Sequence, residues 1–153
     1  MRIQELIKGK GPEVVTVPAT TTVRQLVQTL ADHGIGAVVV MDDGAISGII
    51  SERDVVRALP EQSEHSARSG DSGDLEGLLE RPVSELMTTT VHTCGPDDEI
   101  RSLAGLMTEH RIRHLPVVQD DQLVGIVSIG DIVKFRLQEL QDERDQLESY
   151  ITT

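Results

Sequence analysis

The spacing of apolar positions changes several times along the chain, and the changes occur in the same order in both halves. Short runs rich in valine and isoleucine predict strands, whereas apolar residues three or four positions apart predict helices with one buried face. Each half therefore reads as helix, strand, helix, strand, strand, helix: residues 2–7, 14–17, 23–33, 37–41, 45–50 and a helix from 52 in the first half, and residues 83–87, 91–94, 100–110, 114–118, 123–127 and a helix from 129 in the second.

Polar residues between these segments support the assignment. Asp42-Asp43-Gly44 and Asp120-Asp121 each separate two neighbouring strands, as in a hairpin, so those strands should pair antiparallel. The strand-helix-strand crossover should place the first strand of each half parallel to one hairpin strand. One threonine of Thr21-Thr22 can cap the helix that follows it, and one aspartate of Asp97-Asp98 can cap the corresponding helix.

The two halves form an internal repeat. Residues 14–59 align without a gap on residues 91–136, at an offset of 77, and thirteen pairs are identical. The most regular part is Gly48-Ile49-Ile50-Ser51-Glu52-Arg53-Asp54 against Gly125-Ile126-Val127-Ser128-Ile129-Gly130-Asp131. Because each repeat is short, two small halves that pack together are favoured.

The shared Gly-x-x-Ser-x-x-Asp segment lies where a strand passes into a helix, and it has two compatible interpretations. As a capping box, its serine and aspartate satisfy free backbone N–H groups of the first helical turn. As a binding site, the glycine lets a ligand approach the backbone, and Ser51 or Ser128 faces a phosphate or ribose. Asp54 or Asp131 could then accept both hydrogen bonds of a cis-diol.

Basic residues gather beside the second copy of this segment, in Arg111-Ile112-Arg113-His114. Arginines at the start of a strand could hold an anionic group. The alternative is a solvated strand end with surface ion pairs. Beside the first copy, Arg53 and Arg57 are the comparable residues.

Composition excludes several classes of function. The net charge of −12 argues against a general nucleic-acid binder, because phosphate backbones require clustered lysine and arginine. Cys94 is the single cysteine, so no disulfide forms, and its alignment with Val17 favours a small buried side chain. The first residues lack the apolar stretch of a signal peptide, and no apolar run is long enough for a membrane span. We therefore expect a cytoplasmic protein without membrane contact.

Histidines are the remaining candidate metal ligands. His33 and His110 end two predicted helices, where the helix dipole favours a cation, so a structural role is the simpler interpretation. A metal site built from His92, His110 and His114 is the less favoured alternative.

Two segments lie outside the repeat. Pro60 to Asp74 contains hardly an apolar residue and is predicted to be a mobile linker. The last helix runs on past the repeat, with apolar residues at the a and d spacing of a coiled coil. We favour packing across a homodimer; an amphipathic helix lying on its own domain is the alternative. These residues are Val133, Leu137, Leu140, Leu147 and Ile151.

The duplicated Gly-x-x-Ser-x-x-Asp turn, the strand from Arg111 to Val118 and the tail from Asp145 to Ile151 together resemble stand-alone tandem CBS-domain proteins (cystathionine β-synthase domains). The resemblance implies an α/β fold with mixed sheets, in which two CBS repeats form a pseudo-twofold pair and an extended C-terminal helix follows. It implies residues 1–60 as repeat 1, 61–80 as a flexible linker and 81–153 as repeat 2. Such pairs usually dimerise.

The same resemblance implies clefts between the repeats that bind adenosine-containing ligands: AMP, ADP, ATP, NAD or S-adenosylmethionine. Asp54 and Asp131 would hold ribose hydroxyls, while Ser51 and Ser128 would face the ribose phosphate. Arg53 and Lys10 are further candidates, and the role of Lys10 is the least defined. The residues that would border the adenine are Thr16, Val17, Gly36, Ala37, Thr93, Cys94, Arg113, His114 and Pro116.

One departure from symmetry predicts two unequal sites: Gly34 to Val39 stands in the first repeat where the second has Arg111 to Pro116. The leading hypothesis is a regulatory module in which an adenine nucleotide acts as ligand, not as catalytic cofactor. A dimerising adaptor, docking on an unidentified protein partner without ligand, is the second hypothesis. An enzyme is the weakest, because neither a phosphate loop nor a nucleophile elbow occurs and the serines have no base except the capping carboxylates.

Overall fold

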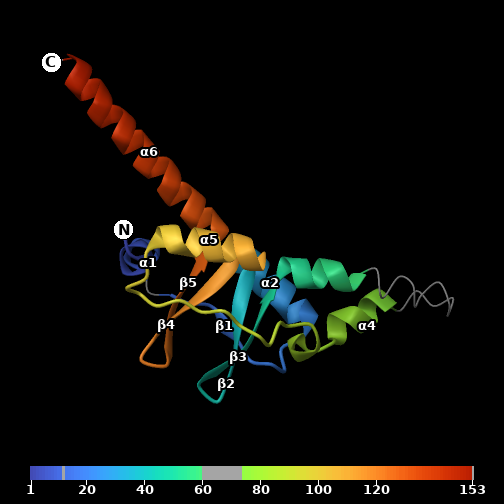
Figure 1. Ribbon diagram of the computed structural model, residues 1–153. Coiled ribbons are helices and arrows are strands. Elements are labelled where there is room, and N and C mark those ends of the chain that lie inside the picture. Colours follow the sequence, from blue (N-terminus) through green and yellow to red (C-terminus); the bar gives the residue numbers. More distant parts are fainter. Residues whose placement is uncertain (12, 60–73, 153) are drawn as a thin grey trace. The chain divides into compact units, whose positions relative to one another are not determined.

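The computed structural model describes residues 1–11, 13–59 and 74–152, which form two compact units (Figure 1). Unit 1 consists of Met1–Val14 and His92–Thr153, and unit 2 consists of Val15–Val91. Both units mix small sheets with helices, as the repeated pattern of apolar positions predicts.

Unit 2 is built on a three-stranded sheet. Strands β2 (Ala37–Asp42) and β3 (Ala45–Ser51) form the predicted antiparallel hairpin, and β1 (Thr16–Val17) pairs parallel to β2. The α2 helix (Val23–His33) makes the crossover, which confirms the predicted strand-helix-strand unit. A helix over residues 52–59 follows β3, and the helices α4 (Asp74–Glu80) and η1 (Val83–Glu85) complete the unit.

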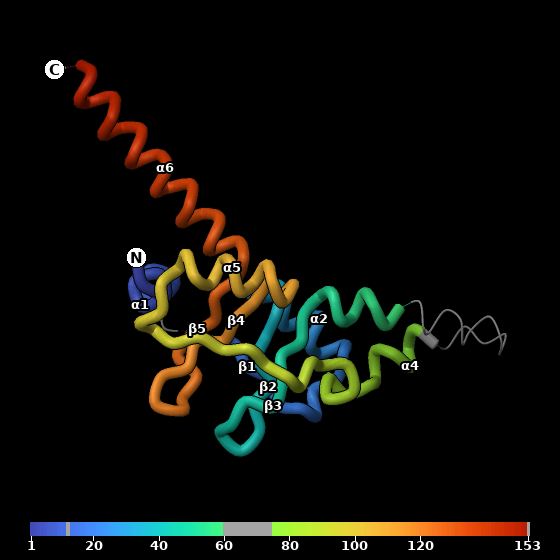
Figure 2. The backbone as a smooth tube through the Cα atoms, viewed as in Figure 1, coloured from blue at the N-terminus to red at the C-terminus, as the bar shows by residue number. Residues whose placement is uncertain are grey.

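Unit 1 repeats this order with a smaller sheet. The helix α5 (Ile100–His110) precedes the hairpin of β4 (His114–Gln119) and β5 (Gln122–Ser128), and α6 (Ile129–Thr152) follows. The helix α1 (Ile3–Lys10) belongs to the same unit. Figure 2 shows both hairpins as narrow loops of the backbone.

The strand predicted at 91–94 is reduced to one parallel bridge, between Cys94 and Val117. Cys94 N–H donates to Pro116 O at 3.0 Å, and Val118 N–H donates to Cys94 O at 2.8 Å. The ladder stops there because Asp98 Oδ2 accepts the next N–H, that of Gly95, at 2.8 Å, and Pro96 has none.

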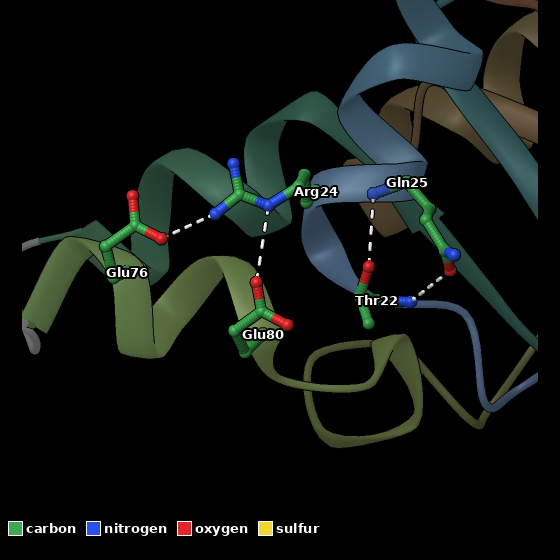
Figure 3. Close-up of polar contacts among 5 residues, drawn as sticks. All are labelled: Thr22, Arg24, Gln25, Glu76 and Glu80. Carbon is green, nitrogen blue, oxygen red and sulfur yellow. Dashed lines mark hydrogen bonds and ion pairs between the residues drawn. The ribbon is translucent and has the colours of Figure 1, made fainter.

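The same contact explains why the predicted cap of α5 is wrong. The residue before the helix is Glu99, which makes no side-chain capping bond, and Asp98 is used by Gly95 instead. In unit 2 the prediction is confirmed, because Thr22 and Gln25 form a reciprocal capping box with bonds of 3.2 and 3.1 Å (Figure 3).

The helices α2 and α5 end at aligned positions that carry different residues. Gly34 follows α2 with φ of 61°, and Arg111 follows α5 with φ of 54°. This left-handed conformation is strained for a residue with a Cβ atom and relaxed for glycine.

Arg111→Gly is therefore expected to stabilise the protein, by about 0.5 to 1 kcal/mol, which is the left-handed penalty less the extra backbone entropy that glycine loses on folding. The matched variant Gly34→Ala should destabilise it by a similar amount. Urea unfolding of both variants measures these changes, and a loss of stability in Arg111→Gly would show that the arginine side chain makes a contact worth more than the strain.

The short helix at the start of each repeat packs against the other repeat's sheet. Ile3 is fully buried in the core of unit 1, and Val83 is fully buried in the core of unit 2. Backbone bonds fix α1 in place: Ile3 N–H donates to Asp98 O at 3.0 Å, and Gln4 N–H donates to Pro96 O at 2.9 Å. Each short helix therefore belongs to the compact unit of the other repeat, and the division of the sequence at 1–60, 61–80 and 81–153 stays a prediction.

The predicted mobile linker, residues 60–74, lies almost wholly outside the described residues. The predicted linker 61–80 ends in α4, whose Leu78 is buried. Arg24 of α2 pairs with α4 through Glu76, at 2.6 Å, and through Glu80, at 3.3 Å (Figure 3). A helix, rather than free chain, therefore leads into the second half of the sequence.

The α6 helix extends well past β5 and α5 of its own unit (Figures 1 and 2). The apolar side chains at its a and d spacing are exposed: Val133, Leu137, Leu140, Leu147 and Ile151 are each at least 50% exposed. Unit 1 does not cover these side chains, although the first part of α6 packs on it through Phe135 and through the pair of Glu139 with Arg101 at 3.3 Å. Within the part of the chain that the structure describes, every helix is too short or too polar to cross a lipid bilayer.

Candidate functional site

Each Ser-x-x-Asp segment forms a tight turn from a strand into a helix. Ser51 N–H donates to Asp54 Oδ2 at 2.8 Å, and Ser128 N–H donates to Asp131 Oδ2 at 2.9 Å. The second turn is a complete capping box, because Asp131 N–H also donates to Ser128 Oγ at 3.1 Å. In the first turn the Ser51 hydroxyl donates to Asp54 Oδ2 instead, at 3.2 Å. The predicted capping box is therefore confirmed in the second repeat, whereas in the first repeat only the aspartate accepts a backbone N–H.

The neighbouring strand brings four more candidate residues to these turns. Ala37 lies opposite Ser51, and Glu52 N–H donates to Gly36 O at 3.0 Å. Unit 1 has the same arrangement, since His114 lies opposite Ser128 and Ile129 N–H donates to Arg113 O at 2.8 Å. In both units, the residue before the first hairpin strand (β2 or β4) is thus hydrogen-bonded to the start of the helix that follows the second hairpin strand.

The candidates on the crossover strands divide into exposed and buried side chains. Thr16 and Thr93 are exposed, whereas Val17 and Cys94 are buried in the cores of their units. Pro116 is also buried, and its carbonyl accepts the N–H of Cys94. Of this group, the two threonines present side chains to solvent.

Cys94 is the buried side chain that its alignment with Val17 predicts. Burial, together with the nearby negative charge of Asp98, raises the pKa of its thiol to about 12. The thiol therefore stays protonated near neutral pH, which makes it a poor nucleophile.

Lys10 lies before the aligned residues 14–59, so the repeat alignment does not predict its partner. Its Nζ donates to Asp131 Oδ2 at 2.7 Å and to Ile126 O at 2.9 Å. Because α1 packs in unit 1, a lysine at the start of the chain reaches the second Ser-x-x-Asp turn. Asp54, the aligned carboxylate, forms no ion pair within the described residues.

The environment of Asp131 holds it ionised. Burial of the carboxyl opposes its charge, but the hydrogen bonds from Lys10 and from Ser128, with the positive charge of Lys10, outweigh that penalty and lower the pKa. The side chain of Asp131 is 22% exposed and that of Lys10 is 38% exposed. The pair is therefore partly open to solvent.

The Lys10–Asp131 pair makes stability depend on pH. A carboxyl whose folded pKa is lowered stabilises the fold above its ordinary value of 3.8 and loses that contribution as pH falls through the folded pKa. Lys10→Met should lower the free energy of unfolding by about 0.2 to 1 kcal/mol at pH 7, and the difference from wild type should vanish in acid. Urea unfolding across this pH range measures it. Lys8→Met is the matched control, and an equal loss in both variants would contradict the assignment.

Two of the three histidines considered as metal ligands lie together. The rings of His92 and His110 stack with centroids 4.3 Å apart, while His114 lies in β4 opposite Ser128. Within the described residues, no group of three or more histidine, cysteine, aspartate or glutamate side chains is arranged to hold a metal ion.

Two sheets, each with a Ser-x-x-Asp turn into the next helix, define a tandem-repeat α/β module. The family model of the CBS domain matches the chain twice, at residues 10–61 and 83–138. The chain belongs to the CBS-domain family and carries two copies of the domain.

Individual relatives agree with this assignment. The mitochondrial CBS domain-containing protein CBSX3 of Arabidopsis thaliana is 36% identical over 149 residues, which cover 94% of this chain and 68% of that protein. The crystal structure of a CBS-domain containing protein from Agrobacterium tumefaciens is 38% identical, with a TM-score of 0.76, and the match covers 89% of this chain and 99% of that one.

A third relative was solved with a ligand. The CBS domain protein of Pyrobaculum aerophilum, complexed with AMP, is 30% identical, with a TM-score of 0.66, and the match covers 86% of this chain and 89% of that one. The α/β fold with small mixed sheets and a C-terminal helix is thus shared with solved CBS pairs.

Proposed function

We propose that this protein is a regulatory module that binds an adenosine-containing ligand at its Ser-x-x-Asp turns and catalyses no reaction. The observation that carries the proposal is the pair of carboxylates, Asp54 and Asp131, fixed at the start of a helix in a chain that is 30% identical to a CBS protein complexed with AMP. AMP, ATP and NAD are the ligands to test first.

The turns have the chemistry that a ribose needs. A carboxylate can accept both hydrogen bonds of a cis-diol, because each oxygen has two acceptor positions. In the first repeat, Asp54 Oδ2 accepts two bonds from Ser51, and Oδ1 accepts none from the described residues. One oxygen of the carboxylate is thus available for a ligand.

Regulation requires that the ligand favour one arrangement of the protein over another, and the coupling cannot exceed that difference in affinity. The two turns differ in their neighbours, since only Asp131 carries a lysine within the described residues. We therefore expect two sites of unequal affinity. The alternative is an adaptor that binds a protein partner equally well without nucleotide. The cytoplasmic location stays a prediction.

A thermal-shift panel with AMP, ADP, ATP, NAD and S-adenosylmethionine tests the proposal. A ligand at one hundred times its dissociation constant stabilises the fold by about 2.7 kcal/mol, and Asp54→Asn and Asp131→Asn should each reduce the shift. Asp142→Asn, on the exposed part of α6, is the control. No shift with any of the five ligands would favour the adaptor.

We also propose that α6 packs against α6 of a second copy. Its exposed apolar residues at a and d spacing would be covered in such a pair. Lys134 and Arg136 lie near the start of the helix, whereas its last part is mostly acidic, so antiparallel helices would place opposite charges together. The acidic residues of that part are Asp142, Glu143, Asp145 and Glu148.

Light scattering after size exclusion tests the pairing. The wild type should have twice the mass of one chain, and the double variant Leu137→Glu/Leu140→Glu should be monomeric, because two carboxylates would enter the interface. Gln141→Glu is the control for added charge alone. A monomeric wild type, or a double variant that stays dimeric, would exclude this use of α6.

A further inference from the structure

Lys10 already occupies the carboxylate that the proposed function assigns to the ribose of the second site. Its ammonium group has two acceptors, Asp131 Oδ2 at 2.7 Å and Ile126 O at 2.9 Å. Both acceptors belong to the turn from β5 into α6, whereas Lys10 is the last residue of α1. The contact therefore joins segments more than one hundred residues apart, with a separation of 121 between Lys10 and Asp131.

This contact limits how a ribose could bind. Asp131 Oδ2 accepts hydrogen bonds from Lys10 and from the backbone of Ser128, so both of its acceptor positions are used. A cis-diol bound through both carboxylate oxygens would compete with the lysine for Oδ2, although among the described residues Oδ1 is open as it is in Asp54. The cost of displacing the lysine depends on whether the ligand offers the ammonium another anion.

Asp54 provides the internal comparison. It accepts hydrogen bonds from Ser51 alone and forms no ion pair within the described residues. A cis-diol that used both oxygens of Asp54 would compete with the neutral Ser51 hydroxyl and not with a cation, so a neutral nucleoside would break no ion pair among the described residues there.

We infer that Lys10 makes the second site selective for adenosine ligands that carry a phosphate, by exchanging the carboxylate of Asp131 for a phosphate oxygen when the ligand binds. The inference rests on the proposed function. A phosphate restores the ion pair that the ribose breaks, whereas a neutral nucleoside leaves the ammonium without an anion. The flexible four-carbon stem of lysine permits this movement, and its side chain is 38% exposed.

Basic side chains near the second turn favour a ligand that carries an anionic group such as a phosphate. Arg113 lies beside the turn, with its carbonyl bound to the N–H of Ile129 and its side chain exposed. The acceptors of Lys10 in the absence of ligand are a carboxylate and a carbonyl, so the ammonium is held in place by groups that a phosphate can replace one for one.

Calorimetric titration with adenosine and with AMP tests the inference, in an Asp54→Asn background that isolates the second site. We expect Lys10→Met to weaken AMP binding about tenfold, the equivalent of one charge-assisted hydrogen bond, and to leave adenosine binding unchanged or tighter. Lys10→Arg should keep the preference for AMP, and Lys8→Met, with a neighbouring lysine removed, should change neither affinity.

The ratio of the two dissociation constants separates the possible roles of Lys10. If Lys10→Met weakens adenosine and AMP equally, or changes neither, the lysine does not select for phosphate and the inference fails while the proposed function stands. If the Asp54→Asn protein with Lys10 intact binds neither compound, the second site is not an adenosine site, and the inference fails with that part of the proposed function.

Discussion

Ile3→Ala is expected to lower the free energy of unfolding by about 2 to 5 kcal/mol, the usual cost of truncating a buried isoleucine. Ile3 is fully buried in a cluster that includes Ile100, Leu103 and Leu115 of the second half of the chain. The loss should therefore fall on unit 1. Hydrogen exchange should speed up in α5, β4 and β5, and the strands β1 and β2 should keep their protection.

Val83→Ala is the matched variant for unit 2. Val83 is fully buried with Leu26, Val38 and Ile50 of the first half, so it should loosen α2, β2 and β3. If Ile3→Ala loosened β1 and β2 instead, α1 would pack with the repeat that it precedes in the sequence, and the placement of Lys10 beside Asp131 would fail with it.

Gly48→Ala is expected to be the second strongly destabilising change, by about 1 to 3 kcal/mol, the range for inserting a group into a packed core. A Cβ atom at Gly48 would lie 2.5 Å from Met87 Sδ and 2.9 Å from the backbone oxygen of Thr88. That oxygen cannot easily move, because it accepts the N–H of Ile49 at 3.0 Å. Strand β3 would have to shift.

Gly125→Ala provides the comparison at the aligned position. The three atoms nearest to its Cβ atom would all belong to the side chain of Ile7, at 3.1 to 3.4 Å, and a side chain can adjust. We expect a smaller loss than at Gly48, measured by urea unfolding of both variants. Equal losses would mean that the backbone of Thr88 yields as readily as the side chain of Ile7.

Much of the local structure is predictable from the sequence because it depends on neighbouring residues. The hairpin turns follow from short polar loops: Asp43, Gly44, Asp120 and Asp121 all have positive φ, as two-residue turns between twisted strands require. The aspartates of the two Ser-x-x-Asp turns cap their helices from three residues away. A competing local bond explains the main error, since Asp98 binds Gly95 instead of capping α5.

The partner of α1 could not be predicted in the same way. Apolar spacing shows that Ile3 and Ile7 lie on one buried face, but it does not show which sheet that face covers. Ile7 of α1 lies over Gly125 of the second repeat, and Met87, which follows η1, lies over Gly48 of the first repeat. The segment at the start of each repeat thus covers the glycine of the other repeat. The ion pair of Lys10 with Asp131 follows from that exchange. Gly48 and Gly125 mark places where another segment can lie close to the sheet, but the same glycine occurs in both repeats and does not show which short helix covers which sheet.

The direct test of the account is a calorimetric titration of the wild-type protein with AMP, alongside the double variant Asp54→Asn/Asp131→Asn. The account predicts saturable binding to two unequal sites in the wild type and its loss in the double variant, which keeps the fold because asparagine still accepts the capping bond. Saturable binding that survives in the double variant would place the ligand elsewhere. No binding of AMP, ATP, NAD or S-adenosylmethionine to the wild type would leave the two aspartates as helix caps alone.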